Sequence, residues 1–335
     1  MQSNHARGRI GFVFAGLLLW PLQAATVRAA EPTPLKVGIS EPVNTVLAIW
    51  MADAAGFYAA NGLKVEIINM SGGSRGAAEL AAGRINAMHV GLSSVARLNR
   101  NGSDLRIVAA LANVIRFTFF SAPGVTNAAG LKGGIVGVST FGSESDATVT
   151  LALQRLGLRR DDVTMRELGA GSRRVAAVKS GEIQATAVNE PTASIAREQG
   201  VHVLVDLVPE RIPWLFTGIA VRRETIENRR DVLRRFLRAT AEGNALAISD
   251  GARAREVLAR QTNTSDAKIL DISYNDFTQL SPPTIEPTSA AAANILAQFP
   301  AGGSATVADH VDTRILDELK REGFFKALEQ KYGKR

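Results

Sequence analysis

The chain has 335 residues, of which 46% are hydrophobic and 21% charged, with 30 glycines, 12 prolines and no cysteine. This composition excludes a disordered or collagen-like chain, the length favours two packed lobes over one oversized core, and the lack of cysteine excludes disulfides, thiolate metal sites and cysteine nucleophiles. The net charge is +7, and the basic residues form no dense run with interleaved aromatic residues, so we predict no nucleic-acid partner.

The N-terminus has the pattern of an export signal. Arg7 and Arg9 precede an apolar stretch from Ile10 to Trp20, and Val27-Arg28-Ala29 offers a cleavage site of the small-x-small type. The stretch has 11 residues, whereas a membrane-spanning helix needs about 20, so an uncleaved anchor is the weaker alternative. A lipoprotein would need a cysteine after this stretch. We therefore expect residues 1–29 to be a cleaved signal peptide and the mature protein to be periplasmic, and not a lipoprotein.

After this signal, short runs rich in β-branched residues alternate with helical segments. The pattern predicts strands over 35–39, 63–69 and 85–90, with helices over 43–60 and 75–82. Such an alternation is typical of parallel strands that are joined by helices. The first part of the mature chain is therefore predicted to be an α/β lobe.

The same pattern returns 98 residues further along the chain. Of the 20 positions from Gly72 to Gly91, 8 are identical to the residues 98 positions later, whereas average composition would give about one or two. The second copy predicts strands over 134–138, 163–168 and 183–188, and helices over 144–156 and 173–179. We therefore expect two similar α/β lobes.

Two apolar, extended stretches flank the second copy, at 116–122 and 214–221. We interpret them as strands that cross between the lobes and form a hinge. Beyond them the sequence predicts helices, with a break at Ser281-Pro282-Pro283 and a last pair over about 287–298 and 313–331. The predicted domains are 35–118 with 219–335 for lobe 1, and 119–218 for lobe 2.

The loops that follow the strands are the predicted binding region. In α/β sheets these loops gather outside the carboxyl ends of the strands, where ligands bind. In this chain they are rich in Gly, Ser, Thr and Asn, which cap helices and leave backbone N–H groups available. We therefore expect several helix N-termini to converge on one cleft, with Ser40 and Ser143 facing each other across it.

A set of short segments in both copies carries a family resemblance. These segments are Leu35 to Ile39, Ala55-Gly56-Phe57-Tyr58, Asn61 to Glu66, Gly72-Gly73, Leu131-Lys132-Gly133, Gly142-Ser143 and Asn189-Glu190-Pro191. Together they resemble the periplasmic substrate-binding proteins of the nitrate/sulfonate/taurine importer family, which includes NMT1-like binders of thiamine precursors. The resemblance implies a two-lobed α/β fold of the periplasmic-binding-protein type II, with two similar parallel-dominated sheets hinged by two crossing strands.

The chain departs from the family at two equivalent positions. The family usually has an aspartate where this sequence has Asn86 in the first copy and Gln184 in the second. Both amides can still bond backbone groups, so we expect the fold to be unaffected.

The candidate ligand-binding residues come from the strand-end loops of both lobes and from one strand beside them. They are Ser40, Asn44, Gly73, Ser74, Ser93, Thr140, Phe141, Gly142, Ser143, Ser172, Asn189, Glu190 and Trp214. The segment from Thr140 to Ser145 is the strongest candidate, because its glycine admits a ligand close to the backbone and its hydroxyls lie at a helix start. An ordinary helix cap is the alternative for this segment.

Three of these candidates have open alternatives. Glu190 could accept N–H groups from an amine or pyrimidine, would repel an anion, or could be a solvated acid near the hinge. Phe141 and Trp214 are candidate aromatic walls of the cleft, or else pack at the core or hinge.

The resemblance implies a receptor that is not an enzyme. We expect it to capture a small anionic, sulfonate-like or carboxylated solute by lobe closure and to deliver it to a membrane permease with its ATPase, as a monomer. A nitrogenous thiamine-precursor ligand, an enzyme related to pyrimidine synthase, and a partner of a membrane sensor are the alternatives. We predict no cofactor and no metal, because His89, His202 and His310 are scattered without ligand spacing.

Overall fold

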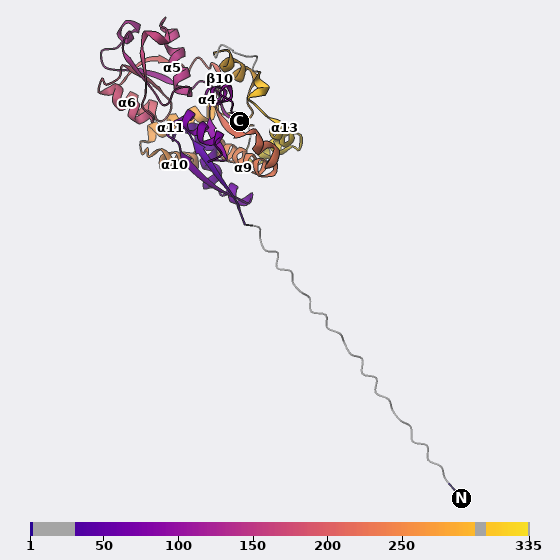
Figure 1. Ribbon diagram of the computed structural model, residues 1–335. Coiled ribbons are helices and arrows are strands. Elements are labelled where there is room, and N and C mark those ends of the chain that lie inside the picture. Colours follow the sequence, from indigo (N-terminus) through magenta and orange to yellow (C-terminus); the bar gives the residue numbers. More distant parts are fainter. Residues whose placement is uncertain (3–30, 299–305, 334–335) are drawn as a thin grey trace. The chain divides into compact units, whose positions relative to one another are not determined.

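The computed structural model describes residues 1–2, 31–298 and 306–333 (Figure 1). Almost all of the predicted signal peptide, residues 1–29, therefore lies outside the described residues. The chain forms two units, one that ends at Glu31 and one that begins at Pro32. Both sheets belong to the second unit. Within the described ranges, no helix has the length and apolar character needed to cross a bilayer.

Sheet A consists of five strands in the spatial order β2-β1-β3-β10-β4. They are β1 (Thr33–Ile39), β2 (Leu63–Asn69), β3 (Ala87–Val90), β4 (Leu105–Val114) and β10 (Pro213–Arg222). β1 pairs in parallel with β2 and β3, and β10 runs antiparallel to β3 and β4.

Sheet B repeats this topology with the order β7-β6-β8-β5-β9. Its strands are β5 (Thr118–Ser121), β6 (Ile135–Val138), β7 (Thr164–Glu167), β8 (Ala185–Val188) and β9 (His202–Asp206). β6 pairs in parallel with β7 and β8, and β5 runs antiparallel to β8 and β9. The two-lobed α/β fold expected from the internal repeat is confirmed. The sheets are parallel-dominated, as expected, because in each of them four strands run in one direction and a single strand, β10 or β5, runs antiparallel to its neighbours.

The repeated amides occupy equivalent positions in the two sheets. The side chain of Asn86 accepts a hydrogen bond from the backbone N–H of Lys36 at 2.8 Å, and Gln184 accepts one from Ile135 at 2.6 Å. Both amides therefore join a segment just before an inner strand to the first strand of the same copy. The expectation that they still bond backbone groups is confirmed.

Helices cover the two sheets and form the C-terminal part of the chain (Figure 1). Those between the strands of the two copies are η1 (Asn44–Val46), α1 (Leu47–Ala54), α2 (Phe57–Ala60), α3 (Gly73–Ala81), α4 (Leu92–Arg100), η2 (Ala128–Leu131), α5 (Glu144–Arg155), η3 (Arg160–Asp162), α6 (Gly171–Lys179) and α7 (Thr192–Glu198). The helix predicted over 43–60 is divided because Gly56 has φ +73°, a left-handed conformation that ends α1 and begins α2.

The C-terminal region is helical, as its sequence predicts. Its helices are α8 (Arg223–Asn228), α9 (Arg230–Ser249), α10 (Gly251–Thr262), α11 (Ala267–Leu280), α12 (Ser289–Ala297), η4 (Val307–Asp309), α13 (Arg314–Arg321) and α14 (Phe324–Tyr332). The long helix predicted over 313–331 is two helices that meet at Gly323.

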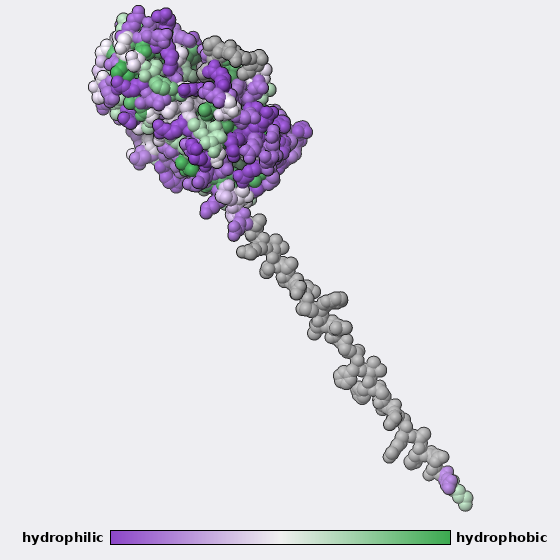
Figure 2. Space-filling model, viewed as in Figure 1, coloured by the Kyte–Doolittle hydropathy of each residue, from purple (hydrophilic) through white to green (hydrophobic). Residues whose placement is uncertain are grey.

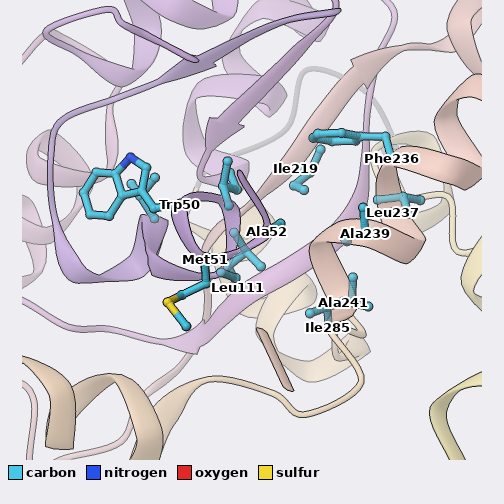
Figure 3. Packing of buried hydrophobic residues seen from close by; sticks show 14 of the residues in the cluster. Trp50, Met51, Ala52, Leu111, Ile219, Phe236, Leu237, Ala239, Ala241 and Ile285 are labelled. Atoms are coloured by element: carbon cyan, nitrogen blue, oxygen red, sulfur yellow. The ribbon is translucent and has the colours of Figure 1, made fainter. Parts of the chain in front are cut away.

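The largest part of the apolar core joins sheet A to the C-terminal helices. In Figure 3, Trp50 and Met51 of α1 lie in one cluster with Phe236 and Leu237 of α9, and Leu111 of β4 completes the contact. α1 is apolar around most of its circumference, which suits a helix packed between a sheet and a second helix. Hydrophilic residues cover most of the face of the folded unit that is seen in Figure 2.

The chain passes between the sheets in two short segments. The first joins β4 to β5 through residues 115–117, and the second joins β9 to β10 through residues 207–212. The stretches expected to cross, 116–122 and 214–221, therefore contain strands that each belong to a single sheet. We keep the domain boundaries as a proposal, with the second moved from 218/219 to the segment before β10.

Candidate functional site

A small cavity of about 50 Å³ lies where loops of the two sheets meet. Its lining includes loops after β1 and β3 of sheet A and loops after β6 and β8 of sheet B. The lining residues are Ser40, Glu41, Val43, Thr45, Gly73, His89, Val90, Gly91, Ser94, Phe117, Ser139, Ser143, Glu144, Ser145, Asn189, Phe216 and Thr217. The cavity thus occupies the edge at which the strand-end loops were expected to converge.

Four predicted site residues line this cavity: Ser40, Gly73, Ser143 and Asn189. The hydroxyl of Ser40 donates to the carbonyl of His89 at 2.7 Å. Ser143, opposite in the fold, is 3.0 Å from the hydroxyls of Ser139 and Ser145. Ser40 and Ser143 therefore face one shared cavity from different sheets.

Four more predicted residues lie at a neighbouring cavity of about 340 Å³ or against it. Ser74, Thr140 and Phe141 line it together with Arg75 and Arg97. Its walls also come from both sheets, because Ser74 follows β2 of sheet A and Thr140 follows β6 of sheet B. The backbone N–H of Ser74 donates to the hydroxyl of Thr140 at 3.4 Å. The fourth residue, Gly142, packs against the side chain of Arg97.

Three further predicted residues lie away from both of these cavities. Asn44 is buried and donates to the carboxylate of Asp276 at 2.6 Å, which ties it to α11. Glu190 lines a different cavity, and its carboxylate accepts hydrogen bonds from Arg197 at 3.0 Å and from the backbone N–H of Ser194 at 3.1 Å. Ser172 is exposed on α6.

The last two predicted residues, Ser93 and Trp214, contact a residue that the sequence reasoning missed. Glu144, the first residue of α5, accepts a hydrogen bond from the backbone N–H of Ser93 at 2.8 Å and from the indole Nε1 of Trp214 at 2.7 Å. Both donors belong to the part of the chain around sheet A, and Glu144 follows a strand of sheet B. An acid at the start of a helix ordinarily complements its own helix dipole, which is why the sequence gave no sign of this contact.

A second carboxylate makes a contact between the two sheets' loops in the opposite direction, from the sheet A side to the sheet B side. Glu41, in the loop after β1, accepts from the backbone N–H of Gly171 at 2.9 Å and from the Arg174 guanidinium at 3.0 Å. Gly171 is the first residue of α6, on the sheet B side. Each sheet thus sends one carboxylate to the start of a helix that follows a strand of the other sheet.

His89 and Thr217 are further lining residues that the sequence reasoning did not assign. Nδ1 of His89 and the hydroxyl of Thr217 are buried without a hydrogen-bond partner among the described residues. Burial lowers the pKa of His89 to about 4, so the ring is neutral at pH 7. The signal that could have indicated His89 was its position near the carboxyl end of β3, beside the strand-end loop.

The chemistry of the cavity is that of a hydrogen-bonding site. Its lining contains hydroxyls, an amide, a neutral imidazole and two carboxylates, and no lysine or arginine. Within the described ranges, no group of three or more His, Cys, Asp or Glu side chains is arranged to hold a metal ion. A ligand in this place would be held by hydroxyls and backbone N–H groups at helix starts.

Comparisons with known proteins found similarity in sequence and in structure. The family model described as "NMT1/THI5 like" matches residues 44–254. The riboflavin-binding protein RibY of Chloroflexus aurantiacus is 29% identical over 238 residues, which cover 68% of this chain. The match spans 66% of that relative's length, just under two thirds.

Solved structures share the fold at low sequence identity. A protein from Bordetella bronchiseptica RB50 has a TM-score of 0.77 at 19% identity, with 87% of this chain and 98% of the other covered. The periplasmic aliphatic sulphonate binding protein SsuA of Escherichia coli has 0.62 at 21%, covering 88% and 94%. The periplasmic nitrate-binding protein NrtA of Synechocystis PCC 6803 has 0.68 at 18%, covering 90% and 89%.

Proposed function

Since this chain belongs to the NMT1/THI5-like family, we propose that it is the solute-binding component of an ABC importer. In this proposal the two lobes capture a small solute between the strand-end loops, close over it and present the closed form to a membrane permease with its ATPase. The observation that carries the proposal is the cavity lined from both sheets, because a solute that touches both lobes stabilises their closed arrangement.

The small volume indicates that the described arrangement is a closed one. A cavity of about 50 Å³ has room for one or two water molecules, each of which takes about 30 Å³ in the liquid. A drug-sized ligand needs roughly 300–1,000 Å³. We therefore propose that the solute enters with the lobes apart and that its size sets how far they close.

We propose a solute that carries an anionic or other strongly accepting oxygen, such as a carboxylate or sulfonate. In support, the N-termini of α4 and α6 each bind a carboxylate of the protein itself. Backbone N–H groups at a helix start can hold such a group without a basic side chain. The nitrogenous alternative has less support at Glu190, because Arg197 and Ser194 already use its carboxylate.

The ligands named for the similar proteins supply the probes for this proposal. These proteins are a riboflavin-binding protein, a sulphonate-binding protein and a nitrate-binding protein. The first name favours a heterocycle with ring carbonyl oxygens, and the other two favour oxyanions. An accepting oxygen is common to all three.

We further propose that the mature protein is a periplasmic monomer, exported by the predicted signal peptide, and a receptor without catalytic activity. In support of the location, SsuA and NrtA, which share its fold, are periplasmic binding proteins. A ligand-sensing role would use the same closed form, and capture of the membrane partner separates the two roles.

Native mass spectrometry of the protein purified from its own periplasm tests the proposal. We expect a bound small molecule that is released unchanged on denaturation. Riboflavin, ethanesulfonate and nitrate are then titrated against the emptied protein by calorimetry. Chemical conversion of the bound compound would contradict the receptor role, and the absence of any bound or binding solute would contradict the importer role.

A further inference from the structure

The contact of Glu144 with the N-terminus of α4 has the features of a binding site that is already filled. One carboxylate oxygen accepts the backbone N–H of Ser93 in the first turn of α4, at 2.8 Å. The other accepts the indole N–H of Trp214, at 2.7 Å. Two N–H donors from one side of the cleft therefore converge on a single carboxylate from the other side.

The surroundings are shaped to this carboxylate. A Cβ atom at Gly91, the residue before α4, would overlap the Glu144 side chain, so glycine is required there for the close approach. Glu144 is 8% exposed and Trp214 is 1% exposed. Glu144 also lines the small cavity, which places it within the space between the sheets.

The carboxylate has no basic partner among the described residues. Its two hydrogen bonds come from a backbone amide and an indole, both neutral. Burial raises the pKa of Glu144 to about 7, and the hydrogen bonds from Trp214 and Ser93 oppose that rise. A buried acid in a cleft without a counter-charge is costly to stability, which favours a functional reason for its presence.

We propose that Glu144 is an internal substitute for the solute: its carboxylate occupies the N–H donors of Ser93 and Trp214 that otherwise bind an accepting oxygen of the solute. This inference rests on the proposed function and specifies how its site is regulated. In the absence of solute, Glu144 holds the cleft closed. A solute binds by taking these two donors, so Glu144 and the solute compete.

The competition defines the recognised group. Only an acceptor can replace a carboxylate on two N–H donors, so the solute presents an oxygen there, from a carboxylate, an oxyanion or a ring carbonyl. His89 Nδ1 and the Thr217 hydroxyl, which line the cavity and have no hydrogen-bond partner in the described part of the chain, are then available to the rest of the solute.

Removal of the carboxylate with an external replacement tests the proposal. In Glu144→Ala, the amide of Ser93 should exchange hydrogen about tenfold faster than in the unmodified protein, because it loses a hydrogen bond to a charged group. Added acetate should slow that exchange again and raise the melting temperature of Glu144→Ala. Acetate should leave the unmodified protein unchanged, because its own carboxylate fills the site.

Two further variants make the test specific. Glu182→Ala removes an exposed glutamate from the sheet B side, whose side chain pairs with Arg166, and should not respond to acetate. Glu144→Gln keeps the side-chain shape with one accepting oxygen instead of two, and should give an intermediate exchange rate even if the alanine variant does not fold.

Equal Ser93 exchange in Glu144→Gln and the unmodified protein would overturn the proposal, as would an acetate effect of equal size with and without Glu144. A different measurement would show that the importer role is wrong. It shows as the absence of a solute in the native mass spectrum, whereas the acetate experiment reports on the two donors alone.

Discussion

Two carboxylates cross the cleft in opposite directions, and they differ in what lies around them. Glu41 reaches the start of α6 and meets the guanidinium of Arg174, whose side chain is 1% exposed. Glu144 reaches the start of α4 and, among the described residues, meets only neutral N–H groups. The same geometry therefore gives a charge-paired contact in one place and an uncompensated one in the other.

The surroundings of Arg174 explain why the Glu41 contact is the more durable. Its guanidinium also donates to the carbonyl of Gly169 at 3.0 Å and to the hydroxyl of Thr186 at 3.3 Å, so it is fixed within the sheet B side. A buried guanidinium that is held in this way favours retention of its acid. The comparison teaches that Glu41 suits a strong closing contact, which breaks when the lobes part, and Glu144 an exchangeable one.

Glu41→Ala should break the durable contact and have the largest effect on stability. It leaves the buried Arg174 without its acid, and loss of one partner from a buried pair costs about 3–5 kcal/mol. We expect a value near the lower end, about 3 kcal/mol, because the Glu41 side chain is 15% exposed. Urea unfolding checks this value, and a loss of well under about 1 kcal/mol would show that the contact is dispensable.

The next largest effect should be a dependence of the unfolding free energy on pH that comes from Glu144. The pKa of Glu144 rises from 4.5 to about 7 on folding, so the folded state binds more protons than the unfolded state between these values. Stability from this group is therefore present below pH 4.5 and is lost as the pH rises to about 7, by up to about 3 kcal/mol.

The difference in unfolding free energy between the unmodified protein and Glu144→Gln, measured from pH 4.5 to 8, isolates this dependence. Subtraction is required because other titratable groups face the cavity. His89, whose folded pKa is lowered to about 4, gives the opposite slope between that value and 6.5, and Glu41 also lines the cavity. A difference that does not vary with pH would contradict the prediction.

Gly91→Ala should disturb the exchangeable contact from the side of α4. The backbone of Gly91 is extended, with φ −84°, so alanine is allowed there, but its Cβ would overlap the Glu144 carboxylate. We expect Glu144 to be displaced, at a cost of roughly 1–3 kcal/mol. Thermal unfolding measures the cost, and a variant that retains the slow Ser93 exchange would show that Glu144 can move without leaving its donors.

The smallest expected effects concern two serines that the sequence treats alike. Ser143→Ala should weaken binding of the solute recovered from the periplasm by about threefold to tenfold, the effect of one neutral hydrogen bond. Ser172→Ala should leave binding unchanged, because Ser172 is exposed and away from the cavity. Calorimetry on both variants checks the difference, and equal losses would return Ser172 to the site.

These serines show what the sequence could supply and what it could not. The repeat aligns strands and loops reliably, and the equivalent hydrogen bonds of Asn86 and Gln184 reflect this. The repeat does not predict which face of a helix lies toward the other lobe. Ser172 and Gly171 are adjacent, yet only Gly171 meets Glu41.

Contacts between the lobes were the other limit. The position of Glu144 at the start of α5 has a sufficient local explanation, so its two donors from the sheet A side were not foreseen. The strand β4 was also missed, although all of its residues are apolar apart from Arg106 and Asn113. The antiparallel entry of β5 and β10 depends on how each lobe is completed by a segment outside its own repeat, which local patterns do not encode.

The late position of β10 in the sequence has a consequence for biogenesis. Sheet B is built from a continuous stretch between Thr118 and Asp206, whereas sheet A needs β10, which is inserted between β3 and β4. In the proposed export, a polypeptide that emerges amino end first presents β1 to β4 roughly one hundred residues before β10, which lies between β3 and β4. During that interval β3 and β4 have unpaired edges, which are prone to aggregation, and chaperone protection at this stage would matter most for the half that is made first.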